Sequence, residues 1–135
     1  MIKEISSEET LLLRQKVLRE GLELEFCRFD GDDLKNTFHL GYFSNNQIIG
    51  IISCMMSCQN QIRGMAIEPS MQGQRIGSAL LEKAIGILKT KNQTSTWCNA
   101  RINAASFYKR HSFFIEGDSF LIEGVGEHFK MLRSL

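Results

Sequence analysis

Residues Met65–Leu81 have the sequence MAIEPSMQGQRIGSALL, and this stretch decides the fold. It begins in a segment rich in β-forming residues, which must end near Pro69 because proline cannot donate to a strand ladder. From Gly73 onwards the period of the apolar residues changes from two to 3.6, which is typical of an amphipathic helix. The stretch therefore predicts a strand, a loop and a helix in succession, and the apolar stripe of the helix consists of Ile76, Leu80, Leu81, Ala84, Ile85 and Leu88.

The loop and the first helical turn have the layout of an anion site. The N–H groups of a helix's first turn lack intrahelical partners and lie at the positive end of the helix dipole, so they can bind a phosphate. Small residues at Gly73, Gly77 and Ser78 let a ligand approach this backbone. The GK[ST] ending of a P-loop and the GxGxxG fingerprint are both missing, which disfavours nucleotide hydrolysis and dinucleotide binding. Equally, Gly73 and Gly77 could only shape a tight turn and a close contact between helix and sheet.

The chain before this stretch begins with a predicted strand at Ile2–Ile5. Ser6 and Glu9 are spaced as a capping box, which predicts the start of a helix. The apolar residues of that helix are Leu11, Leu12, Leu13, Val17 and Leu18, its polar face is Arg14, Gln15 and Arg19, and Gly21 ends it. Residues 23–36 contain Asp30-Gly31-Asp32-Asp33 and are expected to form a loop.

Further strands follow on both sides of the long helix. Thr37–Phe43 and Gln47–Cys58 form a predicted hairpin around Ser44-Asn45-Asn46, whose asparagines tolerate positive φ, and Gln61–Ile67 is the third strand of the meander. After the helix we expect a strand at Thr94–Asn99, a short helix at Asn103–Arg110 and a strand pair at Phe113–Phe120 and Glu127–Leu132. This order indicates an α/β domain with one mixed sheet.

The composition excludes several classes of protein. A chain of 135 residues with 43% hydrophobic residues fits a single domain spanning residues 1–135. Its net charge of +1 does not indicate the excess of positive charge by which proteins bind nucleic acid. The longest nearly apolar run, Ile48–Met56, is far shorter than the roughly 20 residues that span a bilayer, and the charged N-terminus lacks the shape of a signal peptide. We therefore expect a cytoplasmic protein that binds neither nucleic acid nor membranes.

The four cysteines, Cys27, Cys54, Cys58 and Cys98, contain no CxxC pair. The three histidines do not fall near them at zinc-ligand spacing, so no metal site is predicted. We expect reduced and mostly buried thiols.

Two motifs resemble the GNAT superfamily of acyl-CoA-dependent N-acetyltransferases. Gln72–Ser78 resembles the [QR]-x-x-G-x-[GA] signature at the start of the family's cofactor-binding helix. Asn103–Phe113 resembles the second signature, N-x-x-A-x-x-F-Y followed by a strand that usually opens with Gly-Phe. The whole chain also resembles the small bacterial ElaA/YjcF-like branch, in Leu13–Leu18, Phe38–Gly41, Cys98–Arg101 and Gly126–Met131.

The resemblance implies a fold, an activity and a cofactor site. The fold is a mixed, mostly antiparallel sheet of about six to seven strands flanked by about four helices, with a splayed central strand pair that binds acyl-CoA. The activity is transfer of an acetyl group from acetyl-CoA to a primary amine of a small molecule or peptide, by direct attack in a ternary complex. The residues implied for the pantetheine arm and acetyl group are Met65, Ala66 and Ile67. Those implied for the phosphates are Gln72, Gly73, Gln74, Arg75, Ile76, Gly77 and Ser78. Further cofactor-binding residues implied by the second signature are Asn103, Ser106 and Tyr108.

This chain departs from the family pattern at two positions. Arg75 stands where the signature has glycine, and Ser112 stands where glycine usually precedes the last Phe. The first turn of a helix has right-handed dihedral angles that need no glycine, so we expect Arg75 to be tolerated. Its guanidinium either pairs with a cofactor phosphate or points into solvent. Ser112 concerns only a local turn.

Tyr108 matches the family's general acid, which protonates the departing thiolate. A phenol with an ordinary pKa of about 10 suits this role only if the site lowers its effective pKa or couples the proton transfers, and Tyr108 could instead be a core tyrosine. Asn103 resembles the residue that hydrogen-bonds the cofactor arm, and it could also cap the short helix.

The acceptor side is less defined by sequence. The resemblance places Glu25, Asp30, His39 and Cys98 near the acceptor, but no general base stands out, and His39 and His128 are expected to be structural unless they relay a proton through water. An inhibitory disulfide or acyl-cysteine at Cys98 is a further alternative. The chain could also be a sensor that holds acyl-CoA without turnover, or a structural partner that binds no CoA. By analogy with the family it could form a homodimer.

Overall fold

A computed structural model describes residues 1–135 and contains one seven-stranded sheet in the order β1-β2-β3-β4-β5-β7-β6. The strands are β1 (Ile2–Ile5), β2 (Thr37–Ser44), β3 (Gln47–Met55), β4 (Gln61–Ile67), β5 (Ser95–Arg101), β6 (Phe114–Ile122) and β7 (Gly126–Ser134). The α-helices are α1 (Leu11–Leu13), α2 (Ile76–Thr90) and α3 (Ala105–Arg110), accompanied by short 3₁₀ and π turns. The predicted order of elements is thus confirmed.

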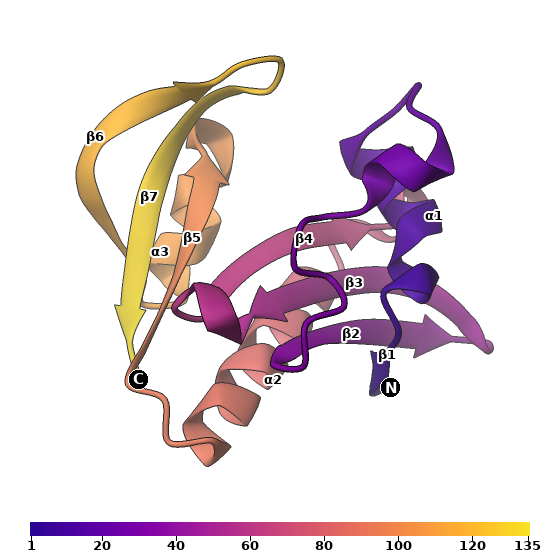
Figure 1. Ribbon diagram of the computed structural model, residues 1–135, viewed down its shortest axis with the longest axis horizontal. Helices are drawn as coiled ribbons and strands as arrows, with labels where there is room; N and C mark the ends of the chain where they lie inside the picture. Colours follow the sequence, from indigo (N-terminus) through magenta and orange to yellow (C-terminus); the bar gives the residue numbers. More distant parts are fainter.

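The sheet consists of two halves that separate in the middle. All neighbouring strands pair antiparallel except β4 and β5, which run parallel and pair only at Gln61 and Trp97. Strands β1–β4 form one half, and β5–β7 with α3 form the other (Figure 1). Beyond Gln61 the edge of β4 that faces β5 has no strand partner, so the splayed central pair is confirmed.

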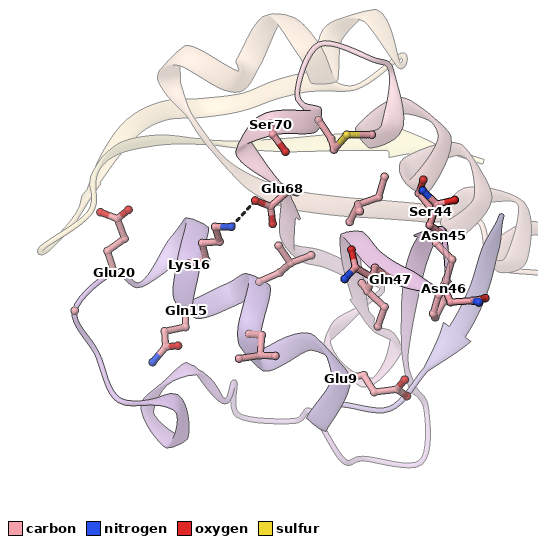
Figure 2. A pocket seen from close by; sticks show the side chains of 17 residues that line it. Glu9, Gln15, Lys16, Glu20, Ser44, Asn45, Asn46, Gln47, Glu68 and Ser70 are labelled. Carbon is pink, nitrogen blue, oxygen red and sulfur yellow. Dashed lines mark hydrogen bonds and ion pairs between the residues drawn. The ribbon is translucent and has the colours of Figure 1, made fainter.

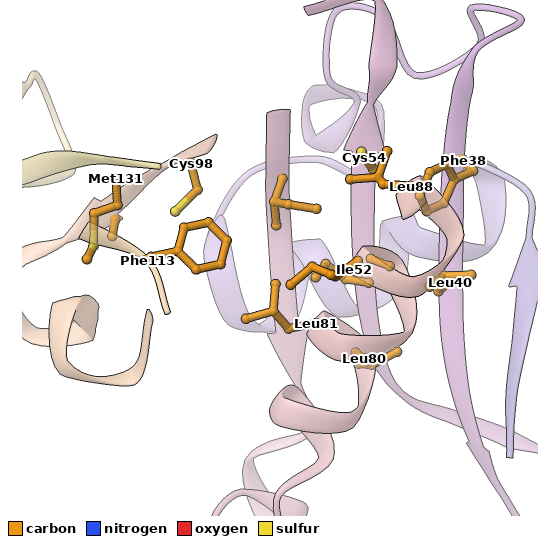
Figure 3. Close-up of a cluster of buried hydrophobic side chains, with 14 of the residues drawn as sticks. Phe38, Leu40, Ile52, Cys54, Leu80, Leu81, Leu88, Cys98, Phe113 and Met131 are labelled. Carbon is orange, nitrogen blue, oxygen red and sulfur yellow. The ribbon is translucent and has the colours of Figure 1, made fainter. Parts of the chain in front are cut away.

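Helix α2 packs against one face of the sheet and connects the two halves. The six predicted stripe residues, Ile76, Leu80, Leu81, Ala84, Ile85 and Leu88, are all buried, which confirms the period of 3.6. They pack against Phe38, Leu40 and Ile52 from β2 and β3, and the same cluster includes Cys98, Phe113 and Met131 from the other half (Figure 3). The core therefore holds the halves together on this face of the splayed pair.

The N-terminal helical segment covers the opposite face. It continues from a 3₁₀ turn at Glu8–Thr10 through α1 into a π-helical turn at Arg14–Leu18. Leu13 packs with Ile51, whereas the next strand residue, Ile52, packs with α2. Because successive strand residues point to opposite faces, α1 and α2 lie on opposite sides of the sheet.

The predicted faces of this helical segment are wrong at two residues. Arg14, expected on the polar face, is completely buried, and Leu12, expected on the apolar face, is 71% exposed. The N–H of Arg19 donates to the carbonyl of Arg14 at 2.9 Å, a bond across five residues. Arg14 lies three residues after Leu11 and three before Val17, so the regular 3.6 period itself places it on the buried face. The prediction is wrong because it assigned these two residues by their polarity and not by their spacing.

Two local predictions are confirmed in the same half. The N–H of Ser6 donates to Glu9 Oε1 at 3.0 Å, and the N–H of Glu9 donates to Ser6 Oγ at 3.3 Å, which is the reciprocal pattern of a capping box. Asn45 and Asn46 both have positive φ in the turn between β2 and β3. No helix of the chain combines the length and apolar character needed to cross a membrane.

Candidate active site

A cleft of about 450 Å³ opens where β4 and β5 diverge. It is lined by Leu18, Arg19, Phe29, Gln61, Ile62, Arg63, Gly64, Met65, Asn99, Ala100, Arg101, Ala104, Tyr108, Ile122, Val125 and His128. Its walls thus come from both halves of the sheet, from α3, and from the loop that follows the N-terminal helical segment.

A β-bulge shapes the β4 wall of this cleft. The register between β3 and β4 shifts between the pair Ile51–Ala66 and the pair Ser53–Arg63, which leaves Gly64 and Met65 together opposite Ile52. Gly64 has φ +68°, and a Cβ there would lie 2.6 Å from Phe29 Cε2, so only glycine fits. Bulges re-aim the backbone next to active sites, and a glycine inside a predicted strand is a sequence signal from which this bulge could have been expected.

The predicted phosphate loop contains a row of free backbone donors. No N–H group of residues 73–78 has a hydrogen-bond acceptor within the chain. These amides precede and open α2, at the positive end of its dipole. Gly73 has φ +83°, and a Cβ there would meet no neighbour within 4 Å, so the turn itself and not crowding requires the glycine. The donor set fits an anionic phosphate group.

The backbone conformation of Arg75 differs from the one expected from the sequence. Arg75 is the N-cap of α2 and has φ +62° and ψ +20°, which is left-handed backbone and not the first-turn geometry expected. Ser112 likewise has φ +68°. Both positions where the family has glycine therefore require the conformation that glycine adopts at the lowest cost. The Arg75 side chain is exposed and makes no ion pair.

Two other loop residues have structural partners. The side chain of Gln72 donates from Nε2 to the carbonyl of Ile67 at 3.2 Å, which fastens the loop to the end of β4. A Cβ at Gly77 would lie 3.1 Å from Met65 Sδ and 3.7 Å from Phe107 Cζ. Gly77 therefore permits a close contact between helix and sheet while its own N–H stays free. Packing of the helix and access of a ligand to the backbone, the two alternatives for this glycine, are thus compatible.

Ser78 belongs to a hydrogen-bonded group that the sequence motifs did not reveal. Ser78 Oγ lies 3.0 Å from His111 Nε2, and His111 Nδ1 hydrogen-bonds Glu82. Burial opposes ionisation of Glu82, but the hydrogen bond from His111 and the charge of Arg133 lower its pKa overall. Since Ser78 and Glu82 are four residues apart on α2, the spacing alone places them on one face, and the group ties that face to the end of α3.

Tyr108 lies in the wall of the cleft, as its predicted role requires. Its ring contacts Phe113 edge-on with centroids 5.4 Å apart, which fixes the side chain in the aromatic cluster of α3. Burial, with a smaller contribution from Cys98, raises the pKa of Tyr108 above its ordinary value. The phenol therefore keeps its proton at neutral pH and faces the cleft as a hydrogen-bond donor.

Asn103 and Ser106 flank this tyrosine on the exposed side of α3. Neither lines the cleft directly. The alternative of an N-cap at Asn103 is wrong, because Asn103 lies in a 3₁₀ turn at Ile102–Ala104 and the N-cap of α3 is Ala104.

The four residues predicted near the acceptor do not line the cleft. Cys98 is 1% exposed, and burial raises the pKa of its thiol to about 12, so it offers no reactive thiolate. His39 is buried between Ser53 Oγ at 2.7 Å and the carbonyl of Asp32 at 2.9 Å. Glu25 is exposed, and a hydrogen bond from Arg28 lowers its pKa, whereas Asp30 is exposed in the loop. All four cysteines are free, and only Cys58 is exposed.

A buried ion pair holds the loop that precedes β2 against the N-terminal helical segment. Arg14 donates to both carboxylate oxygens of Asp32, at 2.7 and 2.9 Å, and to Ser53 Oγ at 3.1 Å. Burial disfavours the ionised form of Asp32, but the Arg14 bonds and the N–H of Phe29 outweigh it and lower the pKa. The pair fixes the loop that carries Phe29, and the sequence could not show it because Arg14 lies at a position expected to face solvent.

A larger hollow of about 1180 Å³ lies elsewhere, between α1, the β2–β3 turn and the segment after β4. Figure 2 shows that Lys16 on its wall is paired with Glu68. It contains none of the residues from the second motif and no part of the β5 wall. The cleft between β4 and β5 therefore is the better candidate for chemistry. No cluster of three or more His, Cys, Asp or Glu side chains that could hold a metal ion is present.

Comparisons with known proteins agree with this geometry. A family model described as an acetyltransferase (GNAT) domain matches residues 17–134. The uncharacterized N-acetyltransferase YitI of Bacillus subtilis (strain 168) is 31% identical over 142 residues, covering 99% of this chain and 95% of that protein.

Among solved structures, Escherichia coli ElaA superposes with a TM-score of 0.80 at 15% identity and 98% coverage of both chains. An aminoglycoside 6'-N-acetyltransferase complexed with coenzyme A superposes with a TM-score of 0.81 at 11% identity, covering 99% of this chain and 96% of that one. These two structural matches show a common fold.

Proposed function

The chain belongs to the GNAT acetyltransferase family, and on this premise we propose that it transfers an acetyl group from acetyl-CoA to a primary amine by direct attack in a ternary complex. The observation that carries the proposal is the row of unpartnered N–H groups at residues 73–78, next to a cleft into which Tyr108 presents its phenol. The amide row follows the C-terminal end of β4 and Tyr108 follows the C-terminal end of β5, and since these strands run parallel, both belong to the same end of the splayed pair.

Acetyl-CoA fits the residues around the cleft. The N–H groups of residues 73–78 would bind its phosphates, with Arg75 free to add a charged contact. Met65, Ala66 and Ile67 at the unpaired edge of β4 would bind the pantetheine arm. Asn103, in the 3₁₀ turn before α3, and Ser106, on α3, would add polar contacts to it. When bound, acetyl-CoA supplies the thioester whose acetyl group is transferred.

Tyr108 acts as the proton donor toward the sulfur of the leaving group. Because burial raises its pKa, the phenol is a weaker acid than an ordinary tyrosine, contrary to the lowering that a stepwise acid would need. A complete transfer from Tyr108 to a thiolate would therefore be unfavourable on its own. The role that its pKa favours is a hydrogen bond to the sulfur, coupled to loss of the proton from the attacking amine.

His128 is the one histidine that lines the cleft. Its Nδ1 lies 2.8 Å from the carbonyl of Gly126, and since a carbonyl only accepts, Nδ1 carries the proton in the neutral ring. Nε2 then has the free lone pair and is the group that we assign to accept the amine proton, directly or through water.

A second candidate function is an acyl-CoA-binding sensor without turnover. The absence of any carboxylate base among the lining residues favours it. The two candidates differ in the effect of Tyr108→Phe. For an enzyme, this change lowers kcat by about 10²–10⁴-fold while the affinity for acetyl-CoA stays unchanged. A sensor releases no thiol with any amine, in the wild type or the variant.

The first test is calorimetric titration of acetyl-CoA, CoA and desulfo-CoA into the purified protein. Gln74 is exposed within the free-amide row, so Gln74→Glu places a carboxylate at the proposed phosphate site, and Gln74→Lys is a control of similar size and opposite charge. We expect binding by the wild type and Gln74→Lys and weaker binding by Gln74→Glu. A well-folded wild type that binds none of the three ligands would overturn the proposal.

A further inference from the structure

The cleft contains a surplus of positive charge. Its lining includes Arg19, Arg63 and Arg101, and no Asp or Glu. None of the three arginines takes part in an ion pair. They come from both halves of the sheet and from the N-terminal helical segment, so the charge surrounds the cleft from several sides.

Two of these arginines gather with a third around one aromatic ring. The guanidinium carbons of Arg14, Arg63 and Arg19 lie 3.7, 4.1 and 5.2 Å from the ring centroid of Phe29. Asp32 neutralises Arg14, which leaves Arg19 and Arg63 without a carboxylate partner. Burial lowers the pKa of Arg63, and the charges of Arg19 and Arg14 lower it further. The group therefore holds like charges together, at a cost to stability, on the wall of the cleft.

The guanidinium of Arg63 has its donors available to a ligand. The side chain of Arg63 makes no hydrogen bond within the chain, and the side chain of Arg19 makes one, from Nη1 to the carbonyl of Phe26 at 2.9 Å. A planar guanidinium matches a carboxylate or phosphate in a bidentate arrangement. Arg63 thus stacks on the Phe29 ring but has no anionic partner within the chain, and an anionic group of the substrate would supply one.

We propose that the acceptor is an amine that carries a carboxylate or phosphate close to its amino group, and that Arg63, supported by Arg19, binds this anionic group. The proposal rests on the proposed acetyl transfer and names the class of acceptor for that same cleft. It assigns Arg63 to substrate recognition, where the sequence pointed instead to acidic residues of the neighbouring loop.

The reaction leaves the anionic group unchanged. A C–N bond forms between the amine and the acetyl carbon, the C–S bond of the thioester breaks, and the proton lost by the amine ends on the sulfur of CoA. The positive cleft also disfavours the protonated form of a bound amine, which helps to supply the neutral nucleophile. Polycationic acceptors such as polyamines and aminoglycosides would meet repulsion from the same arginines.

Matched amines test the proposal through thiol release with acetyl-CoA. One arm compares amino acids with their carboxamides, a second compares an amino-sugar phosphate with the free amino sugar, and a third contains spermidine and kanamycin. We expect kcat/KM to be at least about tenfold higher for the anionic member of one pair, and the pair that shows it identifies carboxylate or phosphate. Acetylation confined to neutral or polycationic amines would overturn the proposal.

Variants of Arg63 assign the effect to its side chain. Arg63→Gln should raise KM for the anionic acceptor about 10–100-fold and bring it close to that of the neutral partner. Arg63→Lys should be intermediate, because lysine keeps the positive charge but lacks the planar guanidinium that binds in a bidentate arrangement. Lys89→Gln removes a positive charge from an exposed position on α2 and serves as the control. An anion preference that survives in Arg63→Gln would contradict the assignment.

A binding measurement separates failure of this inference from failure of the proposed function. N-acetylated amino acids and their carboxamides are titrated into the wild type and Arg63→Gln by calorimetry, which requires no turnover. Binding of the N-acetyl carboxylate that is lost in Arg63→Gln supports the anion site even if no amine is acetylated. N-acetylated amino-sugar phosphate and the free N-acetyl sugar are titrated in the same way. Turnover of amines combined with equal binding within both pairs supports the acetyltransferase and overturns the anion site.

Discussion

The cofactor loop at residues 72–78 and the arginine group around Phe29 are the two ligand-binding regions that we propose, and they are made from different parts of the chain. The loop offers backbone N–H groups, and its side chains are exposed or hold the loop in place. The group around Phe29 offers guanidinium side chains, supported by one buried carboxylate. A loop that binds through its backbone tolerates substitution, even of glycine by Arg75, whereas recognition through side chains depends on each residue. The following predictions test this contrast.

The largest expected effect comes from Arg14→Leu. It leaves Asp32 buried and unpaired, and breaking such a pair costs about 3–5 kcal/mol of the free energy of unfolding. Denaturant unfolding followed by circular dichroism measures this. The double variant Arg14→Leu/Asp32→Leu removes both charges and should recover at least half of the loss. A single variant as stable as the wild type would show that the pair does not support the acceptor side.

The dependence of stability on pH tests the same pair without substitution. The pKa of Asp32 is lower in the folded chain than its ordinary value of about 3.9, so its contribution is complete above that value. The contribution is lost as the pH falls below about 5 and through the lowered pKa of the folded state, so the free energy of unfolding should decrease over that range. The decrease should be smaller in Arg14→Leu/Asp32→Leu, and equal slopes for the two proteins would argue against a role for Asp32.

A smaller effect is expected from Arg75→Gly in the cofactor loop. Glycine relieves the left-handed backbone at φ +62°, so stability should rise by up to about 1 kcal/mol, or about 3–5 °C in Tm. Arg75→Ala removes the same charge but keeps the strain and should give no such gain. Ser112→Gly should behave like Arg75→Gly because Ser112 has φ +68°. A loss of stability in both glycine variants would contradict this explanation of the two positions.

The smallest effect concerns the cysteines. Iodoacetamide should modify the exposed Cys58 of the native protein and leave Cys98 intact, because burial raises the Cys98 pKa to about 12. Mass spectrometry of peptides after brief labelling measures this, with labelling in denaturant as the control. Rapid modification of native Cys98 would reopen a reactive role for this thiol.

The contrast also explains which features the sequence predicts. The six stripe residues of α2, the hairpin at Asn45 and Asn46 and the strand at Gln61–Ile67 depend on local periodicity and turn chemistry, and all three predictions are confirmed. The free N–H groups of residues 73–78 could also be predicted locally, because a short glycine-containing motif marks the start of a helix.

The arginine group could not be predicted in this way. Arg14 is buried in an ion pair with Asp32, 18 residues away, and Arg63 lies over the ring of Phe29 next to the bulge at Gly64. Both depend on contacts between residues far apart in the chain. The charge of Arg14 led to its assignment to a polar face, although its spacing from Leu11 and Val17 matches the buried face. The family resemblance directs attention to Glu25, Asp30, His39 and Cys98, none of which lines the cleft.

The most direct test of the division between the two regions is the affinity for acetyl-CoA, measured by calorimetry in Arg19→Gln/Arg63→Gln and in Gln74→Glu. We predict that the double arginine variant binds acetyl-CoA within about twofold of the wild type, whereas Gln74→Glu binds at least about tenfold more weakly. The reverse result, with affinity lost in the arginine variant and kept in Gln74→Glu, would mean that the arginines bind the cofactor phosphates and that the two regions have been assigned to the wrong ligands.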